Sequence, residues 1–176
     1  MKLIKIYVQH IKVGFTFLNP IYKEKTVKKG TILDVNSLYP SIMYEKLMPF
    51  GEGVFFEGKY EEDKIYPLYI QRITCCFEIK KNKIPTIQIK NNRSYFRPNE
   101  YLENSGNEIQ TLTLTNIDLK LFLENYNVTD LKYINGWKFK GIHGLFTKYI
   151  DKWIKIKNES TLSGNKRNAN TCKINA

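Results

Sequence analysis

The chain has 176 residues, a formal net charge of +11 and 42% hydrophobic residues, which fits one globular domain or a little more and excludes a disordered or collagenous protein. No apolar run reaches the roughly 18 residues that a membrane span needs, and the N-terminus lacks the apolar stretch and cleavage site of a signal peptide. Three cysteines, two of them adjacent, and two histidines exclude a disulfide framework and most histidine-based chemistry, so we expect a cytoplasmic protein with no membrane partner.

The basic charge has two interpretations. Lysine and arginine number 28 against 17 aspartates and glutamates, and the pI is near 9.4. Such an excess favours a polyanionic partner, above all nucleic acid. Lysine, isoleucine and asparagine are also the residues that an AT-rich coding sequence favours, so codon bias alone can raise the charge. The composition leaves both interpretations open.

The first third of the chain predicts a strand, a turn and a helix. Residues 2–8 alternate apolar and basic side chains, and residues 14–18 form a second extended run. Residues 31–35 read as a short β run. The apolar side chains Leu38, Ile42, Met43 and Leu47 then follow at helical spacing. A strand that leads at once into a helix is therefore expected around Asp34.

The middle of the chain predicts a β-rich segment. A turn at residues 51–53 is followed by short β runs at 54–56, 68–72, 74–79 and 85–89. Next we expect a polar loop at 91–107, a strand at 111–115, a helix at 116–126 with Asp118 in its first turn, and an alternating run at 131–139. The adjacent Cys75 and Cys76 fall within a β run, so one thiol should face inward and the other outward.

The last patterned segment is an amphipathic helix over about residues 143–157. Two stripes at i, i+4 spacing mark it: Leu145, Tyr149 and Trp153, then Phe146, Ile150 and Ile154. We interpret it as a core-facing helix, in preference to a membrane-surface or partner-binding helix. The apolar pattern ends after residue 157.

The strongest local signal is Asp-Val-Asn-Ser-Leu-Tyr-Pro-Ser over residues 34–41. A carboxylate at the end of a β run, followed by a tight turn into a helix, can hold a hard cation beside N–H groups that favour phosphate. Tyr39 lies in the first turn of the expected helix and could form a floor under a sugar or base. A lone Asp before a helix is more often simply a cap.

The octapeptide resembles motif A of family B DNA polymerases. The chain is similar to the phage-type, protein-primed branch from about residue 11 to residue 157. The other segments that carry this similarity are Gly-Phe-Thr-Phe-Leu-Asn-Pro from residue 14, Phe-Glu-Gly-Lys-Tyr from 56, Tyr-Pro-Leu-Tyr-Ile-Gln from 66, Ile-Pro-Thr-Ile-Gln-Ile-Lys from 84, Glu-Tyr-Leu from 100 and Tyr-Ile-Asp-Lys-Trp from 149.

The resemblance implies roles for individual residues. Asp34 would be the catalytic aspartate that binds two Mg²⁺ ions, with Mn²⁺ as a substitute, and the carbonyl of Val35 would join the coordination. The turn at Ser37 and Leu38 would offer N–H groups to the triphosphate of an incoming dNTP. The ring of Tyr39 would stack beneath the deoxyribose and exclude a 2′-hydroxyl.

Two basic residues take phosphate-binding positions in the same comparison, namely Lys157 and Arg167. The implied fold is α+β, a partial polymerase palm with an antiparallel sheet, a β-rich insertion and a C-terminal amphipathic helix. We expect residues 1–45 to be the palm segment, 46–144 the insertion, and 145–176 a returning helix with the start of the fingers. The insertion would dock a terminal protein primer and grip DNA, within the host cytoplasm if a phage encodes the chain.

The departures from the family pattern are equally informative. The Tyr-x-Gly-Gly element reads Ile-Lys-Val-Gly from residue 11, and the motif B lysine position holds Thr171. The 176 residues contain neither the motif C aspartate pair nor an exonuclease element. One aspartate cannot hold two Mg²⁺ ions at useful affinity. We therefore expect an isolated chain to be catalytically incomplete: either a fragment of a replicative polymerase or a stand-alone module that binds DNA or terminal protein.

Aromatic and basic side chains also interleave between residues 66 and 101. The aromatic members are Tyr66, Tyr69, Tyr95, Phe96 and Tyr101, and the basic members are Lys90, Arg93 and Arg97. Such interleaving is typical of surfaces that stack on single-stranded DNA. Packing within the protein explains the aromatic residues equally well, so both interpretations stay open.

Overall fold

The computed structural model describes residues 17–35, 37–89 and 100–162. The predicted strand at 2–8, Arg167 and Thr171 lie outside these residues. The chain divides into two compact units. We call Met1–Val27 with Gly53–Phe139 the sheet unit, and Lys28–Glu52 with Lys140–Ala176 the helix-pair unit.

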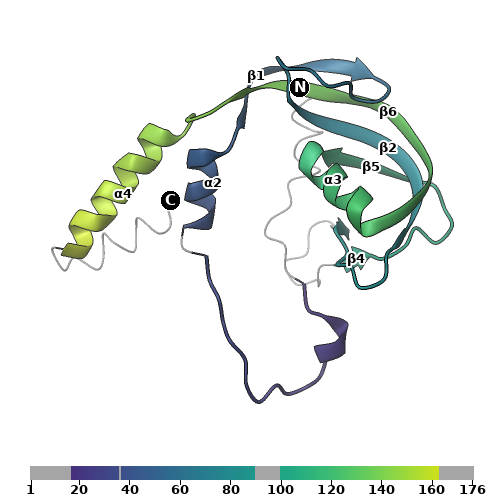
Figure 1. Cartoon of the computed structure of the whole chain (residues 1–176), viewed down its shortest axis with the longest axis horizontal. Coiled ribbons are helices and arrows are strands. Elements are labelled where there is room, and N and C mark those ends of the chain that lie inside the picture. Colours follow the sequence, from purple (N-terminus) through teal and green to yellow (C-terminus); the bar gives the residue numbers. More distant parts are fainter. Residues whose placement is uncertain (1–16, 36, 90–99, 163–176) are drawn as a thin grey trace. The chain divides into compact units, whose positions relative to one another are not determined.

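The main sheet has four strands in the order β1-β6-β2-β5 (Figure 1). Its strands are β1 (Met48–Glu57), β2 (Leu68–Ile79), β5 (Gln110–Thr115) and β6 (Tyr126–Ile142). Strand β2 pairs antiparallel with both β5 and β6. A second sheet pairs β3 (Ile87–Ile89) with β4 (Glu100–Leu102), also antiparallel. The expected α+β fold with an antiparallel sheet is confirmed.

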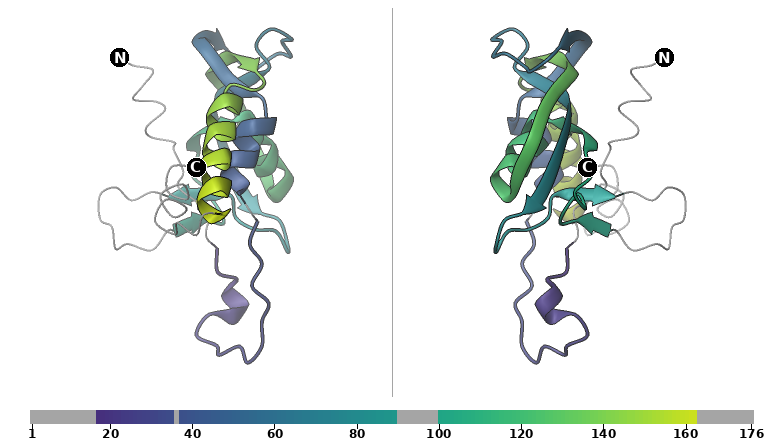
Figure 2. Two further views of the ribbon diagram at one scale, coloured as in Figure 1. Left: turned by 90° about the vertical axis from the view of Figure 1, so that its left-hand side faces the viewer. Right: turned by 90° about the vertical axis from the view of Figure 1, so that its right-hand side faces the viewer.

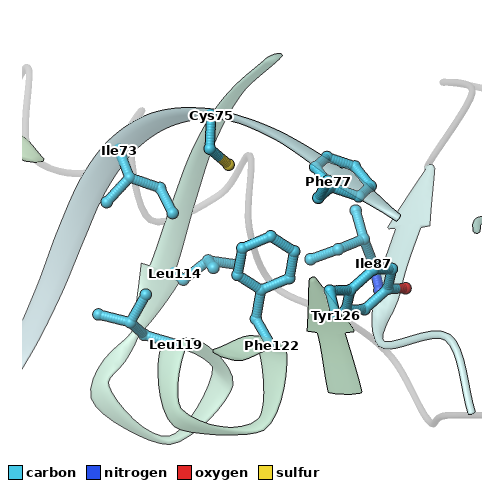
Figure 3. Packing of buried hydrophobic residues seen from close by; sticks show 8 residues of the cluster. All are labelled: Ile73, Cys75, Phe77, Ile87, Leu114, Leu119, Phe122 and Tyr126. Carbon is cyan, nitrogen blue, oxygen red and sulfur yellow. The ribbon is translucent and has the colours of Figure 1, made fainter. Parts of the chain in front are cut away.

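Strand β2 buries one of its two faces almost completely. Every second residue from Gln71 to Phe77 is buried, while Arg72 and Glu78 on the other face are exposed. Helix α3 (Asn116–Asn125) packs against the buried face through Leu119 and Phe122. Figure 3 shows the resulting core of Ile73, Cys75, Phe77, Ile87, Leu114, Leu119, Phe122 and Tyr126. The alternation of buried and exposed side chains along β2 therefore determines on which face of the sheet the core forms.

Side chains cap helix α3 at both ends. The Thr115 hydroxyl accepts a hydrogen bond from the Asp118 N–H at 3.1 Å and donates one to the Asp118 carboxylate at 3.0 Å. At the other end, the Lys80 ammonium donates to the carbonyl oxygens of Leu123 and Glu124 at 3.0 and 3.1 Å. These caps satisfy backbone groups that a helix leaves unpaired, and they account for the helix predicted at 116–126.

Tyr126 fastens the small sheet to the core. Its ring is buried against Phe77 and Phe122, at centroid distances of 5.3 and 5.0 Å. Its hydroxyl donates to the Leu102 carbonyl oxygen at 2.7 Å and accepts from the Thr86 N–H at 2.9 Å. A single phenol thus joins the strand regions on both sides of residues 90–99.

The helix-pair unit packs helix α2 (Leu38–Glu45) against helix α4 (Thr147–Leu162), as Figures 1 and 2 show. The inner face of α4 carries the buried Ile150 and Ser160 and the half-buried Trp153. The predicted stripes were only partly right, because Tyr149 and Ile154 are exposed. Helix α4 begins at 147, after a turn, and continues past residue 157 to Leu162, beyond the apolar pattern; Ser160 in this last part is buried. A short 3₁₀ helix, η1 (Pro20–Tyr22), precedes these elements.

The expected strand at 31–35 is not formed. Residues 31–35 have no regular secondary structure, and Ile32 and Leu33 are 97% and 88% exposed. A β-strand forms only where a neighbouring strand accepts and donates its backbone hydrogen bonds, and the described residues provide no such neighbour for 31–35. Asp34 therefore lies in an exposed irregular segment and not at the end of a buried strand.

The turn predicted at 51–53 lies within β1, where Gly51 has φ +77°. Glycine adopts that conformation without steric cost, so the strand continues through a local irregularity.

Helix α2 ends at Glu45, because Lys46 is already extended on the way into β1. Strand β4 lies inside the predicted polar loop, and β6 is longer than the predicted run at 131–139. Strand β6 pairs with β2 from Tyr126 to Phe139. The apolar pattern of a single strand does not show how far such pairing extends.

Candidate functional site

The turn between Asp34 and helix α2 has an unusual backbone. Ser37, the N-cap of α2, has φ 54° and ψ 40°, which is the left-handed region. A residue with a side chain adopts that region infrequently and at a cost in free energy. The Ser37 side chain makes no capping hydrogen bond, although serine is among the preferred caps. Its carbonyl oxygen nevertheless accepts the first helical bond, from the Ser41 N–H at 2.9 Å.

The missing cap leaves the first N–H groups of α2 without a side-chain acceptor from Ser37. Such groups, together with the positive end of the helix dipole, make an anion site at a helix N-terminus. The Ser41 hydroxyl bonds back to the Leu38 carbonyl oxygen at 2.9 Å and so does not compete for those groups. This geometry can accept a phosphate oxygen.

The side chains around this turn are exposed. Val35 is 63%, Leu38 44% and Tyr39 67% exposed, and Asp34 is exposed as well. Tyr39 occupies the second position of α2, so its ring and the turn belong to the same end of the helix. Helix α2 buries none of its eight residues. The predicted site residues at 34–39 are thus together at one helix end and accessible to a ligand.

Lys157 lies on the helix that packs against α2. It is half-buried and shares a face of α4 with Ile150, seven residues earlier, because that spacing is close to two helical turns. Lys157 therefore belongs to the same unit as Asp34 and Tyr39. Arg167, the second predicted phosphate ligand, lies outside the described residues.

The residues present do not by themselves fit a pair of divalent ions. Within the described ranges, no group of three or more histidine, cysteine or acidic side chains converges on a point where it could hold a metal. Asp34 offers one carboxylate and Val35 one carbonyl oxygen. Mg²⁺ needs six oxygen ligands and usually more than one anionic group. Any two-metal site must therefore draw on further residues.

Cys75, Cys76 and two of the interleaved aromatic residues make contacts within the protein. Cys75 is fully buried and Cys76 is half-buried, as the alternation predicted. Burial, with the neighbouring Cys76 as a smaller cause, raises the pKa of the Cys75 thiol to about 11, so this thiol is not a nucleophile. The Tyr69 ring stacks on Tyr60 at 3.9 Å, and the Lys138 ammonium lies 5.2 Å from the centre of the Tyr66 ring.

Gln71 is a structural residue that the pattern did not reveal. Its fully buried side chain bridges two segments: the amide nitrogen donates to the carbonyl oxygens of Gly58 and Asn135, at 3.0 and 2.9 Å, and the amide oxygen accepts from the Tyr60 N–H at 2.9 Å. A glutamine at an inward position of an otherwise apolar strand face was the available signal. Such a residue has to find partners when buried.

Comparison with known proteins decides the family. The profile described as DNA polymerase type B, organellar and viral, matches residues 9–175. The chain belongs to this family. It is 53% identical over 147 residues to the DNA polymerase of Bacillus phage phi29, and 54% identical over 144 residues to that of Bacillus phage B103. Against the DNA polymerase of Streptococcus phage Cp-1, it is 38% identical over 123 residues.

The three alignments cover 84%, 82% and 68% of this chain, but only 25%, 25% and 22% of the respective phage proteins. The chain therefore spans about a quarter of the length of the relatives it matches. The resemblance to the phage-type polymerases is confirmed, and membership of this family implies the use of a divalent metal.

Within the described residues, no helix is long and apolar enough to cross a membrane.

Solved structures of the phi29 polymerase give the same result. The orthorhombic crystal form matches with a TM-score of 0.86 and 50% identity, over 91% of this chain and 28% of the polymerase. The ternary complex with primer-template DNA and incoming nucleotide matches with a TM-score of 0.81 and 50% identity, over 89% of this chain and 27% of that one. The fold of this chain is thus that of one segment of a phage DNA polymerase.

Proposed function

We propose that this chain is the motif A segment and the β-rich insertion of a protein-primed, DNA-directed DNA polymerase. The observation that carries the proposal is the left-handed, uncapped turn at Ser37, between an exposed Asp34 and helix α2, in a chain that belongs to this polymerase family. A strained turn that leaves helix N–H groups available suits a site that binds a triphosphate.

Asp34 is proposed as the catalytic aspartate of this segment. Its carboxylate, with the carbonyl oxygen of Val35, would be this chain's contribution to a site for two Mg²⁺ ions, in which Mn²⁺ can substitute. Such ions supply charge stabilisation in nucleotidyl transfer. Further acidic residues must complete the site, so we propose that the 176 residues alone do not catalyse extension.

The turn and the helix end would hold the incoming nucleotide. The N–H groups of Ser37 and Leu38 would bind phosphate oxygens of the dNTP, and the exposed Tyr39 ring would lie under the sugar. Lys157, on the adjacent helix, and Arg167 would add positive charge for the phosphates. The phi29 polymerase, which this chain resembles, has been solved in complex with primer-template DNA and incoming nucleotide and with single-stranded DNA. These complexes support DNA and dNTP as partners.

The assignment of the remaining segments is part of the proposal. Residues 1–45 would be palm, 46–144 the insertion that docks a terminal protein and DNA, and 145–176 the returning helix and the start of the fingers. The site of action would be the cytoplasm of an infected host cell. Support for the insertion's separate role comes from its own core, centred on Phe122 and Tyr126.

A chimera tests the proposal. Residues 11–157 replace the homologous segment of the phi29 polymerase, and primer extension is measured with Mg²⁺ and with Mn²⁺. The proposal predicts extension by the chimera and none by the 176-residue chain alone. An inactive chimera that is folded and still binds DNA would contradict the assignment, and extension by the isolated chain would contradict the incomplete site.

The independent core also favours a second candidate. A unit with its own core can act as a stand-alone module that binds DNA or terminal protein without catalysis. The sequence of the adjacent reading frame separates the two candidates, because a motif C there favours the polymerase.

A further inference from the structure

The sheet unit contains a hollow of about 460 Å³, and none of its lining residues belongs to the turn at Ser37. Its lining residues are Lys59, Tyr60, Tyr69, Gln71, Asn116, Leu119, Lys120, Leu123 and Tyr133. They come from the segment after β1, the start of β2, helix α3 and the middle of β6. The volume is in the range of small-molecule sites.

Hydrogen bonds and ring stacking fix the floor and one wall of the hollow. Gln71 forms part of the floor, and its amide bonds hold the backbone at Gly58 and Tyr60 in place. The Tyr60 and Tyr69 rings stack at 3.9 Å with an angle of 16° between their planes. The Tyr60 hydroxyl donates to the Tyr66 carbonyl oxygen at 2.8 Å. The aromatic wall is therefore preorganised rather than dependent on a ligand.

The charge of the hollow is positive. Its lining includes Lys59, from the segment after β1, and Lys120, from helix α3, and no aspartate or glutamate. The Lys59 ammonium lies 5.4 Å from the centre of the Tyr133 ring. Lys120 approaches Glu124 at 4.0 Å, but both side chains are largely exposed, at 78% and 53%. An exposed pair at that distance is weak and leaves Lys120 able to bind an anion.

We propose that this hollow binds one nucleotide unit of single-stranded DNA, in an account that rests on the proposed polymerase function. The two ammonium groups take the phosphate, and the tyrosine rings take the base or sugar, because every base has a face that stacks on an aromatic ring. An acidic peptide would satisfy the lysines, but its carboxylate side chains offer no planar ring to lie against the aromatic residues that line the hollow. The hollow would give the insertion a subsite for single-stranded DNA, formed by other residues than the proposed nucleotide site at Ser37.

Two matched double variants of the 176-residue chain test the charge. Lys59→Ala/Lys120→Ala removes the two lysines of the hollow. Lys132→Ala/Lys155→Ala removes two exposed lysines elsewhere. Lys132 pairs with Thr74, so its side chain lies on the sheet face opposite Tyr133, which pairs with the buried Ile73. Lys155 forms an i, i+4 pair with Glu159 at 4.0 Å, which matches Lys120 and Glu124.

Fluorescence anisotropy with a labelled oligothymidylate gives the dissociation constant over a range of salt concentrations. The slope of the logarithm of the binding constant against the logarithm of the salt concentration should fall in magnitude by about 0.7 in the hollow variant, because the hollow holds one phosphate and each phosphate contact in single-stranded DNA contributes about 0.7. The control variant should keep the wild-type slope. Equal loss in both variants, or no DNA binding by wild type, would overturn the proposal. So would a hollow variant that loses affinity only for a labelled polyglutamate.

Photocrosslinking locates the contact. Oligonucleotides that carry 5-iodouracil crosslink to aromatic residues against which the base stacks, and tryptic digestion then separates residues 60–64 from residues 133–138. We expect crosslinks at Tyr60 or Tyr133, and fewer of them in the hollow variant. Crosslinks confined to peptides that contain none of the lining residues Tyr60, Tyr69 and Tyr133 would overturn the proposal. Primer extension by the chimera is scored separately, so an active chimera without these crosslinks rejects the hollow while the proposed function stands.

Discussion

The side-chain nitrogen of Gln71 donates a hydrogen bond to the carbonyl oxygen of Asn135 at 2.9 Å, between strands β2 and β6. The pairing of the two strands shifts register at this point: Arg72 pairs with Asn135, and Ile73 pairs with Tyr133. The extra residue, Ile134, leaves backbone groups out of the ladder. Gln71 satisfies one of them, and the Gly58 N–H satisfies another by donating to the Ile134 carbonyl oxygen at 2.9 Å.

Replacing Gln71 with methionine should destabilise the sheet unit. Gln71→Met keeps the approximate side-chain volume but removes the partners of the Gly58 and Asn135 carbonyl oxygens and of the Tyr60 N–H. Because these buried groups would be left without hydrogen-bond partners, the free energy of unfolding should fall by about 2–4 kcal/mol. Urea denaturation followed by tryptophan fluorescence measures it. Gln110→Met, at a half-buried position of β5, should cost less than about 1 kcal/mol, and an equal cost would contradict this account.

A second prediction concerns Gly136, which pairs with Gln71. A Cβ atom at Gly136 would collide with the carbonyl oxygen of Ile70 and the ring of Phe56. Gly136→Ala should therefore cost at least about 1–3 kcal/mol, the usual effect of overpacking. Gly30→Ala is the control, because a Cβ there meets no atom within 4 Å. Thermal melting of both variants checks the difference, and similar melting temperatures would contradict the close packing.

A third prediction concerns pH and the ion pair between Asp63 and Lys138. The Lys138 ammonium donates to the Asp63 carboxylate at 2.7 Å. This bond, and then the bond from the Ile65 N–H, lower the pKa of Asp63 below its ordinary 3.8. The same bond raises the pKa of Lys138 above its ordinary 10.5. The pair thus holds the segment after Tyr60 to strand β6 through two charged groups.

The direction of each shift fixes the pH range. The lowered pKa of Asp63 means that its contribution to stability is present above pH 3.8 and is lost as the pH falls through the folded value. The raised pKa of Lys138 means that its contribution is present below pH 10.5 and is lost as the pH rises through the folded value. Melting curves of wild type and Asp63→Asn should therefore differ near neutral pH and converge in acid. A difference that grows in acid would reverse the sign and refute the pair.

Sequence patterns predicted the elements that are defined by local signals. Helix α3 has a capping threonine and an apolar stripe, and β2 alternates so regularly that the opposite burial of Cys75 and Cys76 could be predicted. The register of strand pairing and the hydrogen bonds that a side chain makes between strands could not be predicted from the sequence. The shift at Ile134, the bridge made by Gln71 and the lysines that line the hollow all depend on which strands become neighbours.

In the segment around Asp34, the sequence pattern predicted an element that the structure does not contain. Its residue pattern predicted a strand, but residues 31–35 form no ladder among the described residues, because a strand exists only with a partner. The helix after it was predictable from the spacing of Leu38 and Ile42. The left-handed turn at Ser37 was not, since serine is usually an ordinary cap.

The fourth prediction concerns the choice of sugar and uses the chimera described above. Tyr39→Val removes an exposed ring at the first turn of α2, where the proposed function places the sugar. Extension with dNTP should persist, and discrimination against ribonucleotides should fall on the order of 10²-fold. Parallel extension assays with dNTP and rNTP measure the ratio. Tyr44→Val, near the other end of the same helix, should leave the ratio unchanged, and a similar effect there would remove Tyr39 from the sugar site.

The central claim is that Asp34 supplies a charge that nucleotidyl transfer requires. Asp34→Asn in the chimera keeps the shape of the side chain and removes its charge. Primer extension with Mg²⁺ should fall by at least about 10³-fold, while DNA affinity by anisotropy is unchanged. Asp130→Asn is the control, because Asp130 is exposed with φ 52°, a conformation that asparagine adopts readily. Loss of extension in Asp34→Asn alone is the predicted result, and full activity of that variant would contradict the account.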